Sequence, residues 1–106
     1  DIGQFFPDTD ERIRNIDSTM LLNQVYQYIP TQGFALINAD ITIMAERPKL
    51  LPYRTGIQSR IAGVMGCAVD QISVKATTTE KLGFTGRQEG IMVSCVVLLE
   101  QVTSSD

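Results

Sequence analysis

The segment from Phe34 to Met44 constrains the fold most, because hydrophobic and polar residues alternate along it. The hydrophobic positions on one side are Ala35, Ile37, Ala39, Ile41 and Ile43. The positions between them include Asn38, Asp40 and Thr42. A period of two residues is typical of a β-strand that buries one face. The pattern therefore predicts a strand that requires a hydrophobic layer on one side.

Hydrophobic residues at helical spacing precede and follow this strand. The first set begins after Asp17-Ser18-Thr19, which offers N-cap side chains, and ends at Pro30. Its members are Met20, Leu21, Val25, Tyr28 and Ile29. The second set consists of Ile57, Ile61, Val64 and Met65, with Gly66 at the usual C-terminal position. We expect two amphipathic helices.

Two later stretches favour β-structure. Ile72, Val74 and Ala76 alternate with polar residues, and a strongly hydrophobic strand is expected from Ile91 to about Val102. Residues 78–90 between them are predicted to form a long polar loop. The chain therefore reads as α+β, a single domain over residues 1–106, with two helices on one face of a small sheet. Three strands leave the sheet incomplete, so we expect a further strand or a partner chain.

Composition excludes several functions. The sequence contains no histidine, so a His general base, a Ser-His-Asp nucleophile or a His-containing zinc site cannot come from this chain alone. A net charge of −3 disfavours nucleic-acid binding. Hydrophobic runs are far shorter than the ~20 residues that span a bilayer, so no membrane partner is expected. Cys67 and Cys95 are predicted to be buried small hydrophobic residues in a reducing, cytosol-like compartment.

Three segments have side chains suited to ligands. The first, DIGQFFPDTD, places Asp1, Asp8 and Asp10 where they suit a divalent cation or polyol hydroxyls, although a solvated turn is favoured from composition alone. The second, AERPKLLP, carries Arg47 and Lys49 and suits a phosphate or a negatively charged partner loop, although a solvated surface loop is favoured from this segment alone.

The third segment is KATTTEKLGFTGRQEG. Its hydroxyls and glycine-flanked amides can cradle phosphates, and Glu80 can hold a magnesium ion that bridges them. The alternative is a strand end followed by a flexible hairpin. Long loops in compact domains are more often functional, which favours the ligand site here.

Together, DIGQFFPDTD, NADITIMAERPKLLP and VKATTTEKLGFTGRQEGI resemble the 2-C-methyl-D-erythritol 2,4-cyclodiphosphate synthase family from Asp1 to about Leu99. The resemblance implies a chorismate-mutase-like, trimer-forming α+β domain with a small mixed sheet. It also implies a lyase of the methylerythritol phosphate route of isoprenoid biosynthesis. This enzyme converts 4-diphosphocytidyl-2-C-methyl-D-erythritol 2-phosphate to the cyclodiphosphate and releases CMP. Active sites would lie between subunits of a homotrimer, in the bacterial cytoplasm or a plastid, with Zn²⁺ and either Mg²⁺ or Mn²⁺ as cofactors.

The resemblance also implies roles for individual residues. Thr78 would stabilise the transition state, and Glu80 would bind the magnesium. Substrate contacts would come from Asp1, Ile2, Gly3, Phe6, Pro7, Asp8, Thr9, Asp10, Ala45, Pro48, Lys49, Leu50, Leu51, Thr77, Thr78, Thr79, Glu80, Phe84 and Arg87. Within this set, the segment from Ala45 to Leu51 would enclose the cytosine, while Phe84 and Arg87 would lie near the subunit interface.

The chain departs from the family at its start, where the family's N-terminal third and its zinc-binding histidines have no counterpart. We therefore expect the chain to be the C-terminal two-thirds of a synthase subunit and to be inactive alone. Tyr53 and Gln88 replace residues that are commonly His and Gly in the family. Two alternatives remain open: a noncatalytic module that binds CDP or forms oligomers, and a trimeric regulatory domain without a nucleotide site.

Overall fold

The computed structural model describes residues 17–102. Its elements follow the chain in this order: α2 (Ser18–Thr31), β1 (Phe34–Met44), the 3₁₀ turn η2 (Leu51–Tyr53), α3 (Arg54–Met65), the 3₁₀ turn η3 (Val69–Gln71), β2 (Ile72–Thr77), α4 (Gly83–Gly86) and β3 (Met92–Gln101). Both predicted helices and all three predicted strands are confirmed. None of the described helices is long and apolar enough to cross a membrane.

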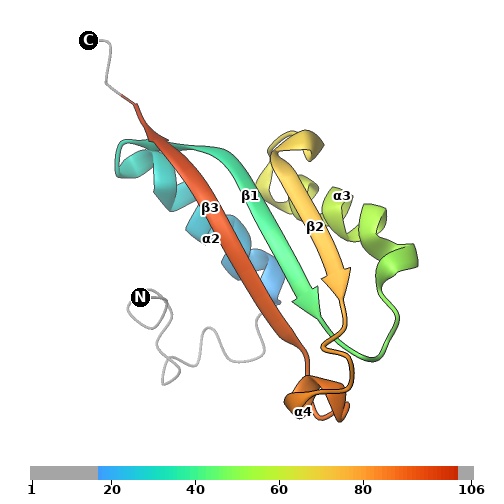
Figure 1. Ribbon diagram of the computed structural model, residues 1–106. Coiled ribbons are helices and arrows are strands. Elements are labelled where there is room, and N and C mark those ends of the chain that lie inside the picture. The colour runs from blue at the N-terminus through green and yellow to red at the C-terminus, as the bar shows by residue number, and fades with distance from the viewer. Residues whose placement is uncertain (1–16, 103–106) are drawn as a thin grey trace.

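The three strands form one mixed sheet in the order β2-β1-β3 (Figure 1). β2 runs parallel to β1, with Met44 beside Thr77 at the carboxyl ends. β3 runs antiparallel to β1 on the other side, with Ile41 beside Cys95. The small α+β fold with a mixed sheet matches the expectation from the sequence.

A β-bulge corrects the predicted face of β1. The pairing with β3 shifts between Leu36 and Asn38, so the alternation of side chains changes there. Leu36 is buried as a result, whereas Ala35 and Ile37 are only half-buried. Alternation resumes correctly beyond the bulge, where Ala39 and Ile43 belong to the core.

The core lies between the sheet and the two long helices, which share one face of the sheet (Figure 1). Its buried members are Leu36, Ala39, Ile43, Ala62, Met65, Ile72 and Val74. Ile57 and Ile61 of α3 pack against this cluster as the helical spacing predicted. Asn23 of α2 donates a 2.7 Å hydrogen bond to the Val64 carbonyl oxygen and so joins the helices.

The ends of the long helices follow their sequence signals. The Asp17 carboxylate accepts a 2.8 Å hydrogen bond from the Thr19 amide, which satisfies one free donor of α2. This bond lowers the pKa of Asp17 below its usual value. Gly66 closes α3 with a φ of 76°, a conformation that favours glycine.

The predicted inward face of α2 is wrong in part. Leu22 and Tyr26 pack against the core, whereas Met20, Val25 and Tyr28 are exposed. The helix carries hydrophobic residues on more than one side, so their spacing alone did not select the face that meets the sheet.

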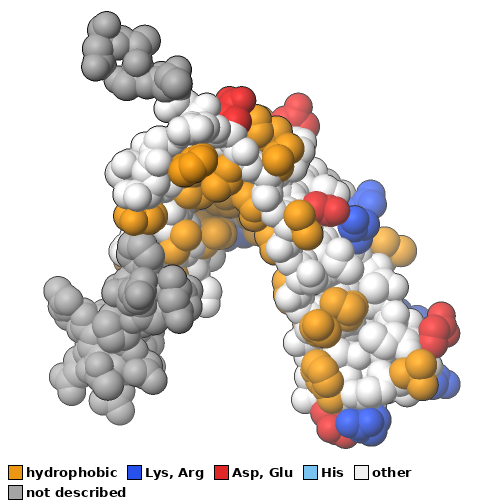
Figure 2. Space-filling model, turned by 60° about the vertical axis from the view of Figure 1, so that its left-hand side comes forward, with side chains coloured by type: hydrophobic (Ala, Val, Ile, Leu, Met, Phe, Trp, Pro, Cys, Tyr) orange, Lys and Arg blue, Asp and Glu red, His pale blue; other side chains and the backbone are white. Residues whose placement is uncertain are grey.

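Strand β3 is exposed along its whole described length. The helices contact its neighbours, with α2 on β1 and α3 on β2, and neither covers β3. Figure 2 shows hydrophobic side chains around a hollowed face of the molecule. The large exposed hydrophobic residues of this strand are Met92, Val93, Val96, Val97, Leu98 and Leu99.

The cysteines also differ from the prediction. Cys95 is exposed because it lies on this uncovered strand, and Cys67 is half-buried. Partial desolvation and the negative charge of Asp40 raise the pKa of the Cys95 thiol. A raised pKa disfavours the thiolate form, which is the nucleophilic form of cysteine.

Candidate functional site

The site begins where two parallel strands end side by side. Met44 at the end of β1 lies opposite Thr77 at the end of β2, and the Ala45 amide donates a 3.0 Å hydrogen bond to the Thr77 carbonyl oxygen. The chain leaves these two strand ends as residues 45–50 and 78–82. Because parallel strands place their carboxyl ends at one edge, the AERPKLLP and ATTTEK segments meet there.

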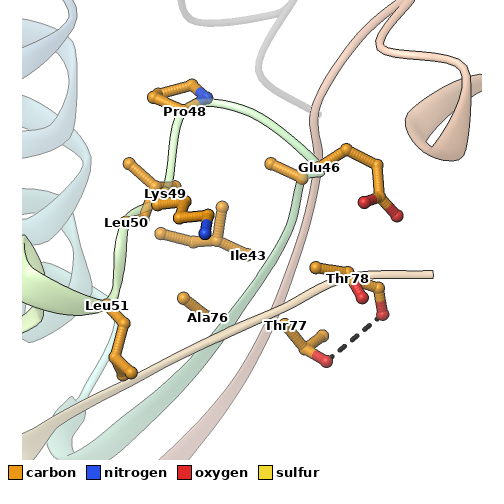
Figure 3. A pocket seen from close by; sticks show the side chains of 10 residues that line it. Ile43, Glu46, Pro48, Lys49, Leu50, Leu51, Ala76, Thr77 and Thr78 are labelled. Atoms are coloured by element: carbon orange, nitrogen blue, oxygen red, sulfur yellow. Dashed lines mark hydrogen bonds between the residues drawn. The ribbon is translucent and has the colours of Figure 1, made fainter. Parts of the chain in front are cut away.

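A pocket of about 300 Å³ lies between these two segments. It is lined by Ile43, Ala45, Glu46, Pro48, Lys49, Leu50, Leu51, Ala76, Thr77 and Thr78. Figure 3 shows the Lys49 side chain beside Ile43, with Thr77 and Thr78 on the other side of the pocket. The pocket therefore combines a hydrophobic floor with the cation Lys49, the carboxylate Glu46 and two threonines. The hydrophobic floor suits a ring, and Lys49 with the threonine hydroxyls suits an anionic group linked to that ring.

Residues 78–90 are more ordered than the predicted polar loop, because they contain the short helix α4. Thr85 is the buried polar residue of the described chain, at 4% exposure, and its hydroxyl lies 2.8 Å from that of Thr79. Thr79 Oγ1 also donates a 2.7 Å hydrogen bond to the Leu82 carbonyl oxygen. These contacts hold the segment as a compact turn beside the pocket.

Glu80 lies at the outer end of this turn, in the left-handed region with a φ of 55°. Its backbone amide donates a 3.3 Å hydrogen bond to the Thr78 hydroxyl, and the side chain is exposed. Magnesium is commonly held by one or two carboxylates together with substrate phosphates. A single exposed carboxylate near Thr78 fits that donor set, so Glu80 is a suitable magnesium ligand.

Zinc does not fit the described residues. The sequence has no histidine, and residues 17–102 contain no group of three Cys, Asp or Glu side chains placed to hold a metal ion. Zinc sites in proteins usually require three or four such ligands.

The structure brings together only part of the predicted site. The pocket includes Ala45, Pro48, Lys49, Leu50, Leu51, Thr77 and Thr78. Thr79, Glu80, Phe84 and Arg87 belong to the adjoining turn and do not line the pocket, and Arg87 forms an ion pair with Glu89. The predicted contacts Asp1, Ile2, Gly3, Phe6, Pro7, Asp8, Thr9 and Asp10 lie outside the described residues.

Two pocket residues, Ile43 and Ala76, were assigned from the sequence only to strand faces, although their positions near the strand ends place them in the pocket. Glu46 falls within the 45–51 segment that was predicted to enclose the cytosine, but it had no individual role. Its Oε1 accepts a 2.9 Å hydrogen bond from the Lys81 amide, a contact that no local spacing indicates.

The sheet, its one-sided helices and this pocket define a small α+β domain with a pocket at one edge of its sheet. The chain belongs to the YgbB family, which matches residues 1–100. Curated relatives are similar over nearly the whole chain. It is 59% identical over 99 residues to the 2-C-methyl-D-erythritol 2,4-cyclodiphosphate synthase of Acinetobacter baylyi, covering 93% of this chain and 61% of the relative. It is 50% identical over 103 residues to that of Haemophilus ducreyi, covering 97% and 64%. The chain thus spans less than two-thirds of these relatives.

Solved structures show the same fold. The bifunctional IspDF from Campylobacter jejuni matches with a TM-score of 0.88 and 48% identity, over 95% of this chain and 27% of that one. IspF of Plasmodium falciparum in its CDP complex matches with a TM-score of 0.81 and 31% identity, over 97% of this chain and 61% of that one. The fold of the chain is therefore that of solved cyclodiphosphate synthases.

Proposed function

We propose that the chain forms the nucleotide-binding part of a 2-C-methyl-D-erythritol 2,4-cyclodiphosphate synthase, a lyase of isoprenoid biosynthesis. The main observation that supports this proposal is the pocket at the carboxyl ends of β1 and β2, where AERPKLLP meets ATTTEK. The similarity to a family member that was solved with CDP supports the same class of ligand.

In this proposal the pocket holds the cytidine diphosphate part of the substrate. The segment from Ala45 to Leu51 encloses the cytosine, because its hydrophobic side chains form one wall. Thr77 and Thr78 donate their hydroxyls to the diphosphate, and Lys49 balances part of its charge. Asp1, Ile2, Gly3 and residues 6–10 are proposed to contact the methylerythritol part, with Thr79, Phe84 and Arg87 as further contacts.

The reaction forms one bond and breaks one bond. An oxygen of the substrate's 2-phosphate attacks the β-phosphorus, the bond from that phosphorus to the bridging oxygen breaks, and CMP leaves with that oxygen. The chain contributes alignment of the phosphates, and Thr78 stabilises the charge that develops on the phosphoryl oxygens. Magnesium or manganese, held by Glu80, would neutralise phosphate charge when bound.

The proposed assembly is a cytoplasmic or plastid homotrimer with its sites between subunits. The uncovered hydrophobic surface of β3 supports a partner on that strand. A zinc ion would require ligands from outside the described residues, and the activity of this chain alone is accordingly proposed to be absent.

The test is CMP release by the full-length protein, with Thr78→Ala and Glu80→Ala made singly and together. We expect each single variant to lose at least about 100-fold in kcat/KM, as for other groups that stabilise transition-state charge. Normal turnover by the double variant would contradict the proposed roles.

A noncatalytic CDP-binding module is the second candidate, favoured by the absence of histidine. Two measurements separate the candidates: titration with CDP and magnesium, and an assay of CMP release. Both are made on residues 1–106 and on the full-length protein. If this chain releases CMP from the substrate by itself, the module is excluded. If it binds CDP without turnover while the full-length protein turns over, the synthase proposal holds. If the full-length protein binds CDP and is inactive, the module is correct.

A further inference from the structure

Glu46 links the two segments that form the pocket. It is the second residue after β1, lines the pocket and is half-buried. Its Oε1 accepts the 2.9 Å hydrogen bond from the Lys81 amide, across a separation of 35 residues. A hydrogen bond to a charged acceptor is stronger than one between neutral groups. The Glu46 side chain thus forms part of one wall of the pocket. It also holds the 78–82 turn, which carries Thr78 of the opposite wall.

The backbone that Glu46 holds has a conformation that needs support. Glu80 and Lys81 have φ values of 55° and 66°, in the left-handed region that side chains other than glycine disfavour. Two consecutive residues of this kind persist only where surrounding contacts fix them. The Lys81 amide is held by Glu46 on one side, and Gly86 packs against the Lys81 backbone on another.

The turn positions the groups that the proposed function uses. Glu80, which is the suitable metal ligand, immediately precedes Lys81, and Thr78, which lines the pocket, is three residues before it. The Thr78 hydroxyl accepts a hydrogen bond from the Glu80 amide, so these residues form one unit with the turn. A displacement of Lys81 would therefore move both.

We propose that Glu46 is a positioning residue, which keeps the 78–82 turn in the form that binds a nucleoside diphosphate with its divalent cation. The inference rests on the proposed function. Glu46 acts through the Lys81 amide and does not contact the reacting atoms. Without it, the turn spends only a fraction of its time in the binding form, and the apparent affinity falls by that fraction. Bound substrate restores the turn, so kcat is conserved.

The experiment uses the full-length protein with Glu46→Ala, Glu46→Gln and the control Asp70→Ala. Asp70 is exposed in η3, which precedes β2, so it lies at the end of the sheet opposite the pocket and away from β3. We expect Glu46→Ala to raise KM about 10-fold, with kcat within about two-fold of wild type. Glutamine retains an acceptor oxygen, so Glu46→Gln is expected within about three-fold of the wild-type KM. Asp70→Ala is expected to match wild type.

A second measurement does not require turnover. Hydrogen exchange of the Lys81 amide in the unliganded protein is expected to be about 10-fold faster in Glu46→Ala than in wild type, and unchanged in Asp70→Ala. Titration with CDP and magnesium is expected to show an affinity loss of the same size. A wild-type protein that binds no CDP would contradict the proposed function, whereas the Lys81 exchange would still test the contact with Glu46. An unchanged Lys81 exchange rate, or a Glu46→Ala variant with wild-type KM, would overturn the inference. The inference would also be overturned if Glu46→Ala lowered only the thermal stability and left both the KM and the CDP affinity unchanged.

Discussion

Gly86 lies directly against the backbone of Lys81. A Cβ at position 86 would be 2.0 Å from the Lys81 carbonyl carbon and 2.6 Å from its oxygen. No side chain fits that space, so Gly86→Ala must separate the two halves of the turn. Overpacking of this kind costs about 1–3 kcal/mol. We expect the affinity for CDP with magnesium to fall at least about 10-fold by calorimetric titration.

Gly63→Ala is the control for this substitution. Gly63 lies within α3, and nothing is within 4 Å of a Cβ built there. Alanine favours a helix interior by about 0.5–1 kcal/mol over glycine. The control is therefore expected to raise the free energy of unfolding and leave CDP affinity unchanged. Wild-type affinity in Gly86→Ala would show that the close packing is unimportant for the site.

Ile72 tests the core beneath the sheet. It is 1% exposed at the start of β2 and belongs to the main hydrophobic cluster. Truncation of a buried isoleucine to alanine costs about 2–5 kcal/mol. Ile72→Ala is expected to lower the free energy of unfolding by that amount in urea denaturation. Ile91→Ala, at a position that is 50% exposed, should cost under about 1 kcal/mol. Equal losses would mean that the assigned core is wrong.

The N-cap of α2, Asp17, predicts that the stability of the folded chain depends on pH. The Thr19 amide and hydroxyl lower the pKa of Asp17, so the folded state favours the carboxylate. The resulting stabilisation of the folded state is present at pH values above the ordinary pKa of aspartate. It is lost as the pH falls through the lowered pKa of Asp17. Asp17→Ala should reduce stability at neutral pH and flatten this dependence in thermal unfolding at stepped pH. Asp17→Asn keeps a cap without titrating. An unchanged acid profile in both variants would exclude the role of Asp17.

Substitution of Lys49 tests whether the positive charge in the pocket contributes to CDP binding. Lys49 lines the pocket, whereas Lys75 on β2 is paired with Asp40 at 2.8 Å outside it. Lys49→Met is expected to weaken CDP binding about three- to ten-fold, and less so at high salt, because a partly exposed cation is screened. Lys75→Met removes the same charge and is expected to leave CDP affinity unchanged. Equal effects of the two substitutions would show that only net charge matters.

The sequence predicted much of the fold because its local signals were strong. Alternation identified β1 and β2, and Gly66 and Asp17 marked helix ends that the structure confirms. The bulge after Leu36 was missed because it depends on pairing with β3, which no local pattern of β1 shows. The exposed Cys95 was missed for the same kind of reason, since helix placement decides what β3 buries.

The site was predicted in part. The resemblance to a known family identified the pocket residues Ala45, Pro48 to Leu51, Thr77 and Thr78, whereas composition alone favoured a solvated loop for the first of these segments. The contact between Glu46 and Lys81 joins residues far apart in the chain and depends on the parallel pairing of β1 with β2. The order within residues 78–90 depends on the buried Thr85, which has the same residue type as exposed threonines nearby.

The most direct test of the proposed function is phosphorus NMR of the full-length protein with 4-diphosphocytidyl-2-C-methyl-D-erythritol 2-phosphate and magnesium. Attack by the 2-phosphate on the β-phosphorus predicts that CMP and the cyclic diphosphate appear in equal amounts, with loss of both products in Thr78→Ala. If the wild-type protein gives no CMP, or gives CMP with an open-chain phosphate in place of the cyclic product, the account is contradicted.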